Sequence, residues 1–341
     1  MRRLNLLYLL PALAILSCSE DSITPETEEQ LLETKELSAN VEMAYPQDFG
    51  MLSDVYYAGK KITVEEIDGD FIYEGDIIFT SDMLKNNPAE LNYEKGALVD
   101  TQKSVGRTSG MWPNNTVYYD IDSSLPDQNR ALDAIKHWEA NTSLQFVQRT
   151  SQSNYIYFTP GSGCSSYVGM VGGRQNITLA SGCSTGNTIH EVGHAVGLWH
   201  EQSRVDRDKH IKINYSNIQS GREHNFQTYE ESGADGEEFT SNLDFGSIML
   251  YSSYSFSSNG QPTIVKLDGS TFSVQRNALS SGDIQGINGM YPTGTTAPTY
   301  INGEYYTISG LTVLRMNDFW YLRTKYGFKR VELRNARWYW V

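Results

Sequence analysis

Short runs of alternating apolar and polar residues cover much of the chain, and few stretches repeat at helical spacing. Residues 41–103 contain strand-like runs, such as Lys61 to Ile67 and Phe71 to Phe79, and no long periodic helix. Thr116 to Ile121 has the pattern of another strand, whereas Gln128 to Ala140 places apolar residues at helical spacing. This mixture of strands and helix predicts the α+β class of fold.

The second half of the chain gives fewer regular signals. Tyr155 to Phe158 is a strand candidate, and Val168 to Leu179, which contains three glycines, predicts a hairpin. Beyond residue 200, Gly, Ser and Asn occur throughout, and helix signals are confined to Asn214 to Gln219 and Ser281 to Met290. We therefore expect a domain whose first half mixes strands and helices and whose second half is irregular.

The composition changes again near the C-terminus. Residues 293–298 predict a linker, and residues 299–341 are rich in aromatic side chains and modestly basic. Alternation from Arg330 to Trp338 predicts short strands, so this segment is expected to be small and rich in β-structure. Its aromatic rings either stack on glycans or form a small core, and the core is the favoured interpretation.

Residues 1–17 have the features of a secretory signal peptide. Two arginines precede an apolar run from Leu4 to Leu16, which is too short to span a bilayer. The sequence ending in Cys18 resembles the lipobox of bacterial lipoproteins, in which this cysteine is lipidated and becomes the new N-terminus. The alternative is an ordinary signal peptide with an incidental cysteine. We expect an extracytoplasmic protein whose precursor is attached to the membrane through Cys18.

The chain has only three cysteines. With Cys18 assigned to lipid, Cys164 and Cys183 remain as an even pair in a compartment that permits disulfides. A bridge between them would close a loop of about 20 residues, which contributes roughly 3 kcal/mol in the chain-entropy model. Two free thiols are the competing interpretation.

Negative charge is concentrated near the N-terminus. The 341-residue chain has a formal net charge of -14, which argues against binding of nucleic acid. Residues 19–103 carry 20 acidic and 6 basic side chains, whereas residues 104–292 carry 18 and 12. The acidic segment is therefore expected to be a separable unit with a role of its own.

The strongest chemical signal is the sequence H-E-x-x-H-x-x-G-x-x-H, which begins at His190. His190 and His194 lie four residues apart, so one face of a helix can present both imidazoles to a metal ion. Gly197 suits a left-handed helix terminus, after which His200 can reach a third position. Three protein ligands leave a place for water, as in a catalytic zinc site. A bare H-E-x-x-H arises by chance, but the added glycine and third histidine favour one zinc ion with Glu191 beside it.

With this motif in place, residues 112 to 292 resemble the astacin family of metzincin zinc metalloproteases, peptidase family M12A. Glu201 to Asp208 continues the zinc motif as astacins do, Gly161 to Gly169 is similar to the family's upper strand and first loop cysteine, and Ser247 to Tyr251 resembles its Met-turn. The resemblance implies a zincin-like catalytic domain over residues 104–292. The second cysteine pair usual in animal astacins is missing, which leaves open how the ends of the domain are held.

The resemblance also implies roles for single residues. Met249 would pack beneath the metal, and Tyr251 would be a switchable extra zinc ligand that supports the tetrahedral intermediate. Glu201 would bind the new N-terminus after maturation. Arg276 would line the pocket for the residue after the scissile bond and favour Asp or Glu there. Without this context Met249 is an ordinary core methionine, and Tyr251 is one of 22 tyrosines.

Residues 19–103 correspond, by the same resemblance, to an acidic propeptide. Tyr73-Glu74-Gly75-Asp76 is similar to the F-x-G-D motif of astacin propeptides, with tyrosine in place of phenylalanine. The aspartate of that motif occupies the zinc in the zymogen, so Asp76 is the expected extra ligand. An aspartate in a Gly-Asp turn is otherwise common.

Maturation is expected to cut the chain near Lys103 or Arg107, two basic residues that look exposed in a stretch rich in Ser and Gly. Cys18 would stay with the propeptide after such a cut. Activation would therefore release the enzyme from the membrane.

The predicted function is a zinc-dependent endopeptidase that acts on proteins or peptides and is made latent by Asp76. The metal lowers the pKa of bound water toward about 7, and Glu191 accepts its proton and later passes it to the leaving amine. A monomer is expected. Two alternatives remain, namely a zinc-binding module without turnover, which would be expected to lack Glu191, and a surface-interaction module whose residues 299–341 bind a partner.

Overall fold

The computed structural model describes 43–57, 60–85, 106–107, 110–234, 236, 238–292, 303–308, 311–316, 319–325, 327–334 and 337–340. The signal peptide, Cys18, Lys103 and the predicted linker lie outside the described residues. No helix among the residues that the structure describes is both long enough and apolar enough to cross a membrane.

The first described element is an antiparallel sheet of five strands, which we call the N-terminal sheet, with the order β4-β3-β2-β1-β5. Its strands are β1 (Met51–Tyr57), β2 (Lys60–Ile67), β3 (Asp70–Tyr73), β4 (Ile77–Phe79) and β5 (Leu84–Lys85). The run predicted from Phe71 to Phe79 is therefore two strands. Glu74 and Gly75 have φ angles of 47° and 78°, and this left-handed turn places Asp76 at its end.

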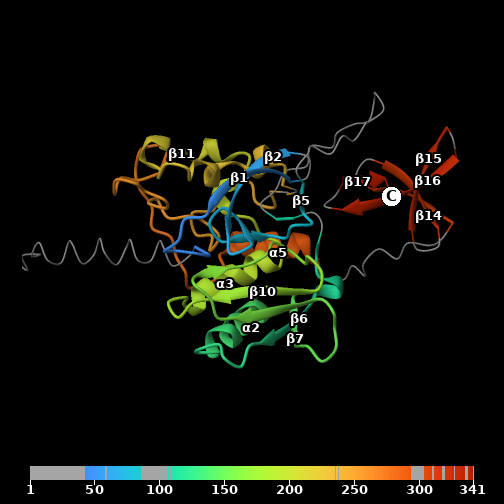
Figure 1. Ribbon diagram of the computed structural model, residues 1–341, viewed down its shortest axis with the longest axis horizontal. Helices are drawn as coiled ribbons and strands as arrows, with labels where there is room; N and C mark the ends of the chain where they lie inside the picture. The colour runs from blue at the N-terminus through green and yellow to red at the C-terminus, as the bar shows by residue number, and fades with distance from the viewer. Residues whose placement is uncertain are drawn as a thin grey trace, which may run out of the picture. The chain divides into compact units, whose positions relative to one another are not determined.

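The central domain (residues 110–292) begins with a mixed sheet of order β7-β6-β8-β10-β9 (Figure 1). Its strands are β6 (Thr116–Ile121), β7 (Gln145–Gln148), β8 (Tyr155–Thr159), β9 (Cys164–Ser165) and β10 (Arg174–Leu179). Strands β7, β6, β8 and β10 pair in parallel, and β9 is an antiparallel strand at the edge. The helices α2 (Asn129–Asn141) and α3 (Thr185–Ala195) share one hydrophobic core with this sheet.

The hairpin predicted over Val168 to Leu179 is wrong. Gly169, Gly172 and Gly173 all have positive φ, so the chain bends at these residues instead of extending as a strand. Only the second part of the segment forms a strand, and β10 pairs in parallel with β8 and antiparallel with β9. The glycines were correctly seen as turn residues, but strand partners distant in sequence decide the pairing.

The second half of the central domain is irregular, as predicted. A short sheet and several single-turn helices surround a core that includes Phe226, Leu250 and Ile264. The elements are η2 (Glu201–Ser203), η3 (Arg207–Lys209), β11 (Ile211–Ile213), η4 (Tyr215–Asn217), η5 (Glu223–Phe226), α4 (Tyr229–Ser232), β12 (Ile264–Lys266) and α5 (Ser281–Met290). The helix predicted from Ser281 to Met290 is confirmed, whereas the signal at Asn214 to Gln219 yields only the single turn η4.

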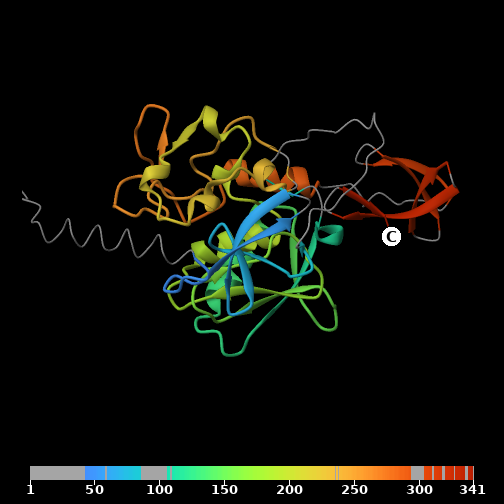
Figure 2. The same cartoon turned by 45° about the horizontal axis from the view of Figure 1, so that its top comes forward.

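The C-terminal segment, red in Figure 2, forms a five-stranded antiparallel sheet, which we call the C-terminal sheet. Its strands are paired in chain order. The strands are β13 (Tyr305–Ile308), β14 (Leu311–Met316), β15 (Phe319–Thr324), β16 (Gly327–Arg334) and β17 (Arg337–Trp340). Val313, Val331 and Trp338 form its small core, which confirms the favoured interpretation in part. Phe319 and Trp340 nevertheless remain 42% and 50% exposed. The α+β class predicted from the sequence is confirmed.

Candidate metal centre and active site

Helix α3 presents two of the three predicted histidine ligands. Ser184 caps its N-terminus, because its hydroxyl accepts from the Asn187 N–H while the Asn187 side chain accepts from the Ser184 N–H. His190 and His194 lie one turn apart and are buried. The helix ends at Ala195, and Gly197, with φ of 112°, reverses the chain as predicted.

Asp76 lies among the three histidines. Its Oδ2 is 3.3 Å from His190 Nε2 and 3.2 Å from His200 Nε2, and its Oδ1 is 3.7 Å from His194 Nε2. The four ligand atoms lie within 4.8 Å of one another, and all four residues are buried. The histidine cluster and the approach of Asp76 are thus where the sequence placed them.

The hydrogen bonds of the outer nitrogens, Nδ1, determine which ring nitrogen of each imidazole carries a proton. His190 Nδ1 donates to the Ile248 carbonyl at 2.7 Å, and His194 Nδ1 donates to the Leu198 carbonyl at 2.8 Å. His200 Nδ1 donates to Glu74 Oε2 at 2.8 Å. In its neutral form, each imidazole therefore turns an unprotonated Nε2, which can only accept, toward the cluster.

This arrangement of acceptors fits a cation. The Nε2 atoms of His190 and His200 lie within hydrogen-bonding distance of Asp76 Oδ2, whereas His194 Nε2 lies 3.7 Å from Oδ1. Asp76 Oδ1 and His194 Nε2 are buried without a hydrogen-bond partner among the residues that the structure describes. Three imidazoles and a carboxylate are a ligand set of Zn²⁺, and hydrogen bonds to the outer nitrogens are the usual support of such ligands.

The ligands also perturb one another's protonation in the metal-free protein. Burial alone would raise the pKa of Asp76, but the three histidines hold it well below its usual range. Burial lowers the pKa of His194, and the neighbouring His200 adds to this effect. For His200 burial also acts to lower the pKa, but Asp76 and Glu74 outweigh it and raise the pKa to about 9. Metal binding at this site must therefore displace protons.

Glu191 and Tyr251 lie at the same centre. Glu191 follows His190 directly in α3 and is fully buried. The Tyr251 ring is 4.6 Å from the His200 ring, and its hydroxyl donates to the Glu74 carbonyl at 2.5 Å. Tyr251 thus contacts the turn that carries Asp76.

The Met-turn packs below helix α3. A Cβ on Gly193 would lie 2.7 Å from the sulfur of Met249, so only glycine allows this contact without a shift of the methionine. The buried Asp283 of α5 holds the turn in shape, because its carboxylate accepts from the Ser247 hydroxyl and the Ile248 N–H. Met249 therefore lies in the core against the metal-binding helix.

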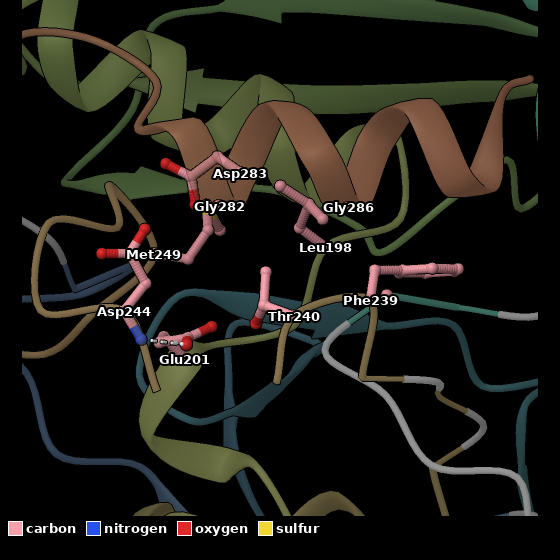
Figure 3. A pocket seen from close by; sticks show the side chains of 10 residues that line it. Leu198, Glu201, Phe239, Thr240, Asp244, Met249, Gly282, Asp283 and Gly286 are labelled. Atoms are coloured by element: carbon pink, nitrogen blue, oxygen red, sulfur yellow. Dashed lines mark hydrogen bonds between the residues drawn. The ribbon is translucent and has the colours of Figure 1, made fainter. Parts of the chain in front are cut away.

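Glu201 is buried at one wall of a cavity of about 20 Å³, which is space for a water molecule (Figure 3). Its Oε1 accepts from the Asp244 N–H at 2.7 Å and lies 3.5 Å from Arg204 Nη1. Burial raises the pKa of Glu201 to about 8 and also raises that of Asp283, which lines the same cavity. Gly106 lies at this cavity as well, so the chain just before the central domain reaches the cavity at Glu201.

Glu74 was not predicted as a functional residue. It is 1% exposed, and its Oε1 accepts from the Ser203 hydroxyl at 2.7 Å in addition to its contact with His200. Nothing in the sequence distinguishes this glutamate from the variable position of the propeptide motif. Its positive φ is the one local sign, and that angle is visible only in the structure.

A buried ion pair between Glu65 and Arg222 was also missed. Glu65 lies on β2, and Arg222 lies in the irregular half of the central domain, with 3% and 4% exposure. The Glu65 carboxylate also accepts from the Gly50 N–H at 2.6 Å. Because 157 residues separate the partners, no local pattern could reveal the contact.

The disulfide between Cys164 and Cys183 is present and joins the edge strand β9 to the segment before α3, as predicted. Arg276 is partly buried, and its Nη2 donates to the Leu250 carbonyl at 2.9 Å. A Cβ on Gly186 would lie 1.6 Å from the Arg276 carbonyl oxygen, so the start of α3 packs directly on this segment. Arg276 thus lies between the start of α3 and the Met-turn, and its role in a substrate pocket stays a prediction.

The expectation that Arg107 is exposed is wrong. Arg107 is 2% exposed, its N–H donates to the Gly197 carbonyl at 2.8 Å, and its Nη1 donates to the Val168 carbonyl at 2.5 Å. A protease could reach the bond after Arg107 only if this segment were pulled out of the domain. Lys103, the other predicted position, lies outside the described residues, so the cut near it stays a prediction.

Comparison with known proteins identifies the central domain. Residues 104–292 match the model of the family described as Astacin (Peptidase family M12A). The chain is 40% identical over 231 residues to Blastula protease 10 of Paracentrotus lividus, covering 64% of this chain and 38% of that protein. It is 41% identical over 208 residues to Flavastacin of Elizabethkingia meningoseptica, covering 57% and 45%.

Among solved structures the chain is similar to High choriolytic enzyme 1, a hatching enzyme zinc-protease from Oryzias latipes. The sequence identity is 28%, the TM-score is 0.48, and the match covers 58% of this chain and 98% of that one. The chain thus spans less than half the length of the curated relatives named above, and nearly all of the solved chain.

Proposed function

The chain belongs to the astacin family, and from this premise we propose that it is a zinc-dependent endopeptidase in its latent precursor form. The single observation that carries the proposal is the cluster of acceptors around Asp76. Three imidazole nitrogens and a carboxylate converge in a buried site, and these are ligand types that Zn²⁺ prefers.

The chemistry divides between the metal and the side chains around it. Zn²⁺, when bound, acidifies a water molecule and polarises the scissile carbonyl. Glu191 is the general base that takes the proton from this water and then delivers it to the leaving amine. The Tyr251 hydroxyl, once it leaves the Glu74 carbonyl, donates to the oxyanion of the tetrahedral intermediate.

Latency follows from the position of Asp76. Its carboxylate fills the place that the catalytic water needs, and the Tyr251 hydroxyl is held by the same turn. The precursor therefore has neither the water nor the free oxyanion donor. Residues 19–103 act as a propeptide in this proposal, and the catalytic domain spans residues 104–292.

Maturation involves the cavity at Glu201. Two buried acids with raised pKa values, Glu201 and Asp283, face a space that the chain reaches at Gly106. A new α-ammonium group formed by a cut near Lys103 would enter this space, directly or through water, and pair with Glu201. The charge that burial disfavours in the precursor is thus compensated in the mature enzyme.

Substrate preference is proposed at Arg276. Its guanidinium lies beside the Met-turn and donates to the Leu250 carbonyl, so it adds positive charge near the metal centre. An Asp or Glu after the scissile bond would be favoured by this charge. Proteins or peptides are the substrates in this proposal, and the protein acts as a monomer.

The address of the protein is proposed from its first residues alone. A signal peptide with lipidation at Cys18 would hold the precursor at an extracytoplasmic membrane surface. Palmitate labelling of the expressed precursor and of Cys18→Ser checks this point, since label in the variant would contradict it.

Removal and return of the metal tests the proposed activity. The chain, cut between residues 86 and 103 and freed of its propeptide, is assayed on casein before and after treatment with a chelator. We expect activity to disappear with the zinc and to return with one equivalent of Zn²⁺. Chelator-resistant cleavage would show that the metal is not part of the reaction.

A further inference from the structure

Residues 43–85 form a folded unit that grips the central domain at several places besides Asp76. We propose that this unit stays bound after the connecting chain is cut and acts as a non-covalent inhibitor, anchored by Glu74 and Glu65. The inference rests on the proposed function. It adds that one cut is not enough for activation.

The first anchor is a hydrophobic core shared between the two parts. Tyr57, Tyr73 and Phe79 of the N-terminal sheet stack on one another, with ring centroids 4.5 and 5.3 Å apart. Trp199 and Val168 of the central domain are buried in the same cluster. Separation would expose apolar surface on both sides, which is unfavourable in water.

The second anchor is the buried pair of Glu65 and Arg222. Arg222 also lies 5.0 Å from the centre of the Phe49 ring, and the Gly50 N–H donates to Glu65. Neither charged side chain is more than 4% exposed, so neither can be left without the other at low cost. The pair therefore joins β2 of the N-terminal sheet to the irregular half of the central domain.

The third anchor is Glu74, which contacts the central domain through both side chain and main chain. Its carboxylate accepts from His200 Nδ1 and from the Ser203 hydroxyl, and its carbonyl accepts from Tyr251. The bond to His200 does not depend on a bound metal, because it is made by Nδ1, whereas Nε2 faces the cluster. Glu74 thus adds to the inhibition independently of Asp76.

The fourth anchor consists of main-chain hydrogen bonds to the edge of the mixed sheet. The Ile78 N–H donates to the Ser166 carbonyl at 2.8 Å, and the Ser166 N–H donates to the Asp76 carbonyl at 3.0 Å. A Cβ on Gly163 would lie 1.7 Å from the Met43 carbonyl oxygen, so the central domain accepts this close approach only with glycine. The turn therefore adds to an open sheet edge, which is a common mode of peptide binding.

None of these anchors lies in the connecting stretch, residues 86–105. A cut there makes these four sets of contacts intermolecular but removes none of them. Activation then needs a second event, either dissociation or destruction of residues 43–85. If Cys18 is lipidated, the cut enzyme also stays at the membrane until that second event.

The experiment uses the full chain with a site-specific protease sequence in place of residues 96–101. Glu191→Ala is included so that the cut protein cannot digest itself, and gel filtration shows whether the two pieces elute together. We expect co-elution at micromolar concentration. The version with Glu191 intact should stay latent after the cut and gain casein-cleaving activity only on dilution or after a second protease degrades the propeptide.

Variants test the anchors. Glu74→Ala and Glu65→Ala in the cut chain should each raise the dissociation constant of the two pieces by about 30-fold or more, because each leaves a buried polar partner unpaired. Asp54→Ala is the matched control, since its carboxylate is exposed and contacts only neighbouring β2 residues. Circular dichroism and hydrogen exchange of the uncut variants verify that both parts remain folded.

The outcomes are distinct. Immediate separation of the cut pieces at micromolar concentration would overturn the proposal, as would dissociation constants unaffected by both anchor variants. Co-elution is measured in Glu191→Ala and does not depend on turnover. A chain that co-elutes but never cleaves casein, even after the propeptide is degraded, would therefore contradict the proposed activity and leave the docking intact.

Discussion

The metal centre is assembled from two regions that differ in how they are held. His190, His194 and the Met-turn belong to one domain, and the outer nitrogens of both histidines donate to carbonyls of that same domain. Asp76 and Glu74 come from a turn between β3 and β4 and reach the centre from outside. The central domain holds His190 and His194 in place by itself. The turn between β3 and β4 instead supplies Asp76 to the cluster in the way a ligand would.

His200 lies between these regions. It comes from the central domain, but its outer nitrogen depends on Glu74 rather than on a carbonyl of its own domain. If residues 19–103 are removed, as we propose, this nitrogen needs a new partner, such as water. The comparison teaches that a site can be complete in its ligands and still depend on a separate part of the chain for the orientation of one of them.

The largest expected effect comes from replacing Asp76, which lies in the turn that reaches the centre from outside. Asp76→Ala in the full chain takes away the carboxylate that fills the water position, so the uncut precursor should cleave casein. We expect casein-cleaving activity on the order of 10³-fold above that of the wild-type precursor. This factor corresponds to the upper range of the free energy that is lost with one buried charge contact. Asp54→Ala serves as control. Because Glu74 also holds this turn in place, the same comparison is made with Glu74→Ala present in both chains, and continued latency of the double variant would show that Asp76 does not block the site.

The next largest effect is expected for Tyr251, which belongs to the central domain. Tyr251→Phe should lower the kcat of the matured enzyme by on the order of 10²-fold, because one donor to the oxyanion is lost. Zinc content should stay at one ion per chain. Tyr254→Phe, at a partly exposed tyrosine three residues away, is expected to leave kcat unchanged. A fully active Tyr251→Phe would remove this tyrosine from the mechanism.

The sequence predicted the ligands from the central domain far better than the residues of the N-terminal sheet that contact it. The spacing of His190, His194 and His200 contains the geometry of the ligands, because a helix and a glycine turn are local structures. Asp76 was found only through a resemblance. Glu74 and Glu65 were missed, since their partners His200 and Arg222 lie more than 120 residues away. Local propensity carries no information about such pairs.

The same limit explains the errors in the fold. The sheet strand at Thr116–Ile121 and the helix at Ser281–Met290 were correct because their patterns are local. The hairpin at Val168 to Leu179 was wrong because its glycine-rich first part bends, and β10 pairs with β8 and β9, which precede the segment. Arg107 looked exposed in a polar stretch, but three of its contacts are made with residues 60 to 90 positions away, where no periodicity reaches.

A smaller effect is expected for the substrate preference that we propose for Arg276. Arg276→Ala should reduce the preference for Asp over Leu after the scissile bond by about tenfold, as one charge contact of roughly 1.4 kcal/mol is lost. Matched peptides that differ at that position give the ratio of kcat/KM values. Arg174→Ala, on the exposed side of β10, should leave the ratio unchanged. An unaltered ratio in Arg276→Ala would place the selectivity elsewhere.

The smallest effect on cleavage is expected for the disulfide. Replacing Cys164 and Cys183 by serine frees the edge strand from the segment before α3 and should cost about 3 kcal/mol of stability. Thermal unfolding of the matured enzyme measures this loss. Cleavage at 25 °C should change less than twofold, because neither cysteine contacts the ligand cluster. Equal melting temperatures of the two proteins would mean that the disulfide adds nothing to the stability of the central domain.

The most direct test of the central claim combines activity with metal content. Casein cleavage is measured for the matured protein and for its Glu191→Ala variant, and zinc is quantified in both. We predict one zinc per chain in each protein and a loss of activity in the variant on the order of 10²- to 10⁴-fold, as expected for a general base. Equal activity of the two proteins, or absence of zinc from the wild type, would contradict the account.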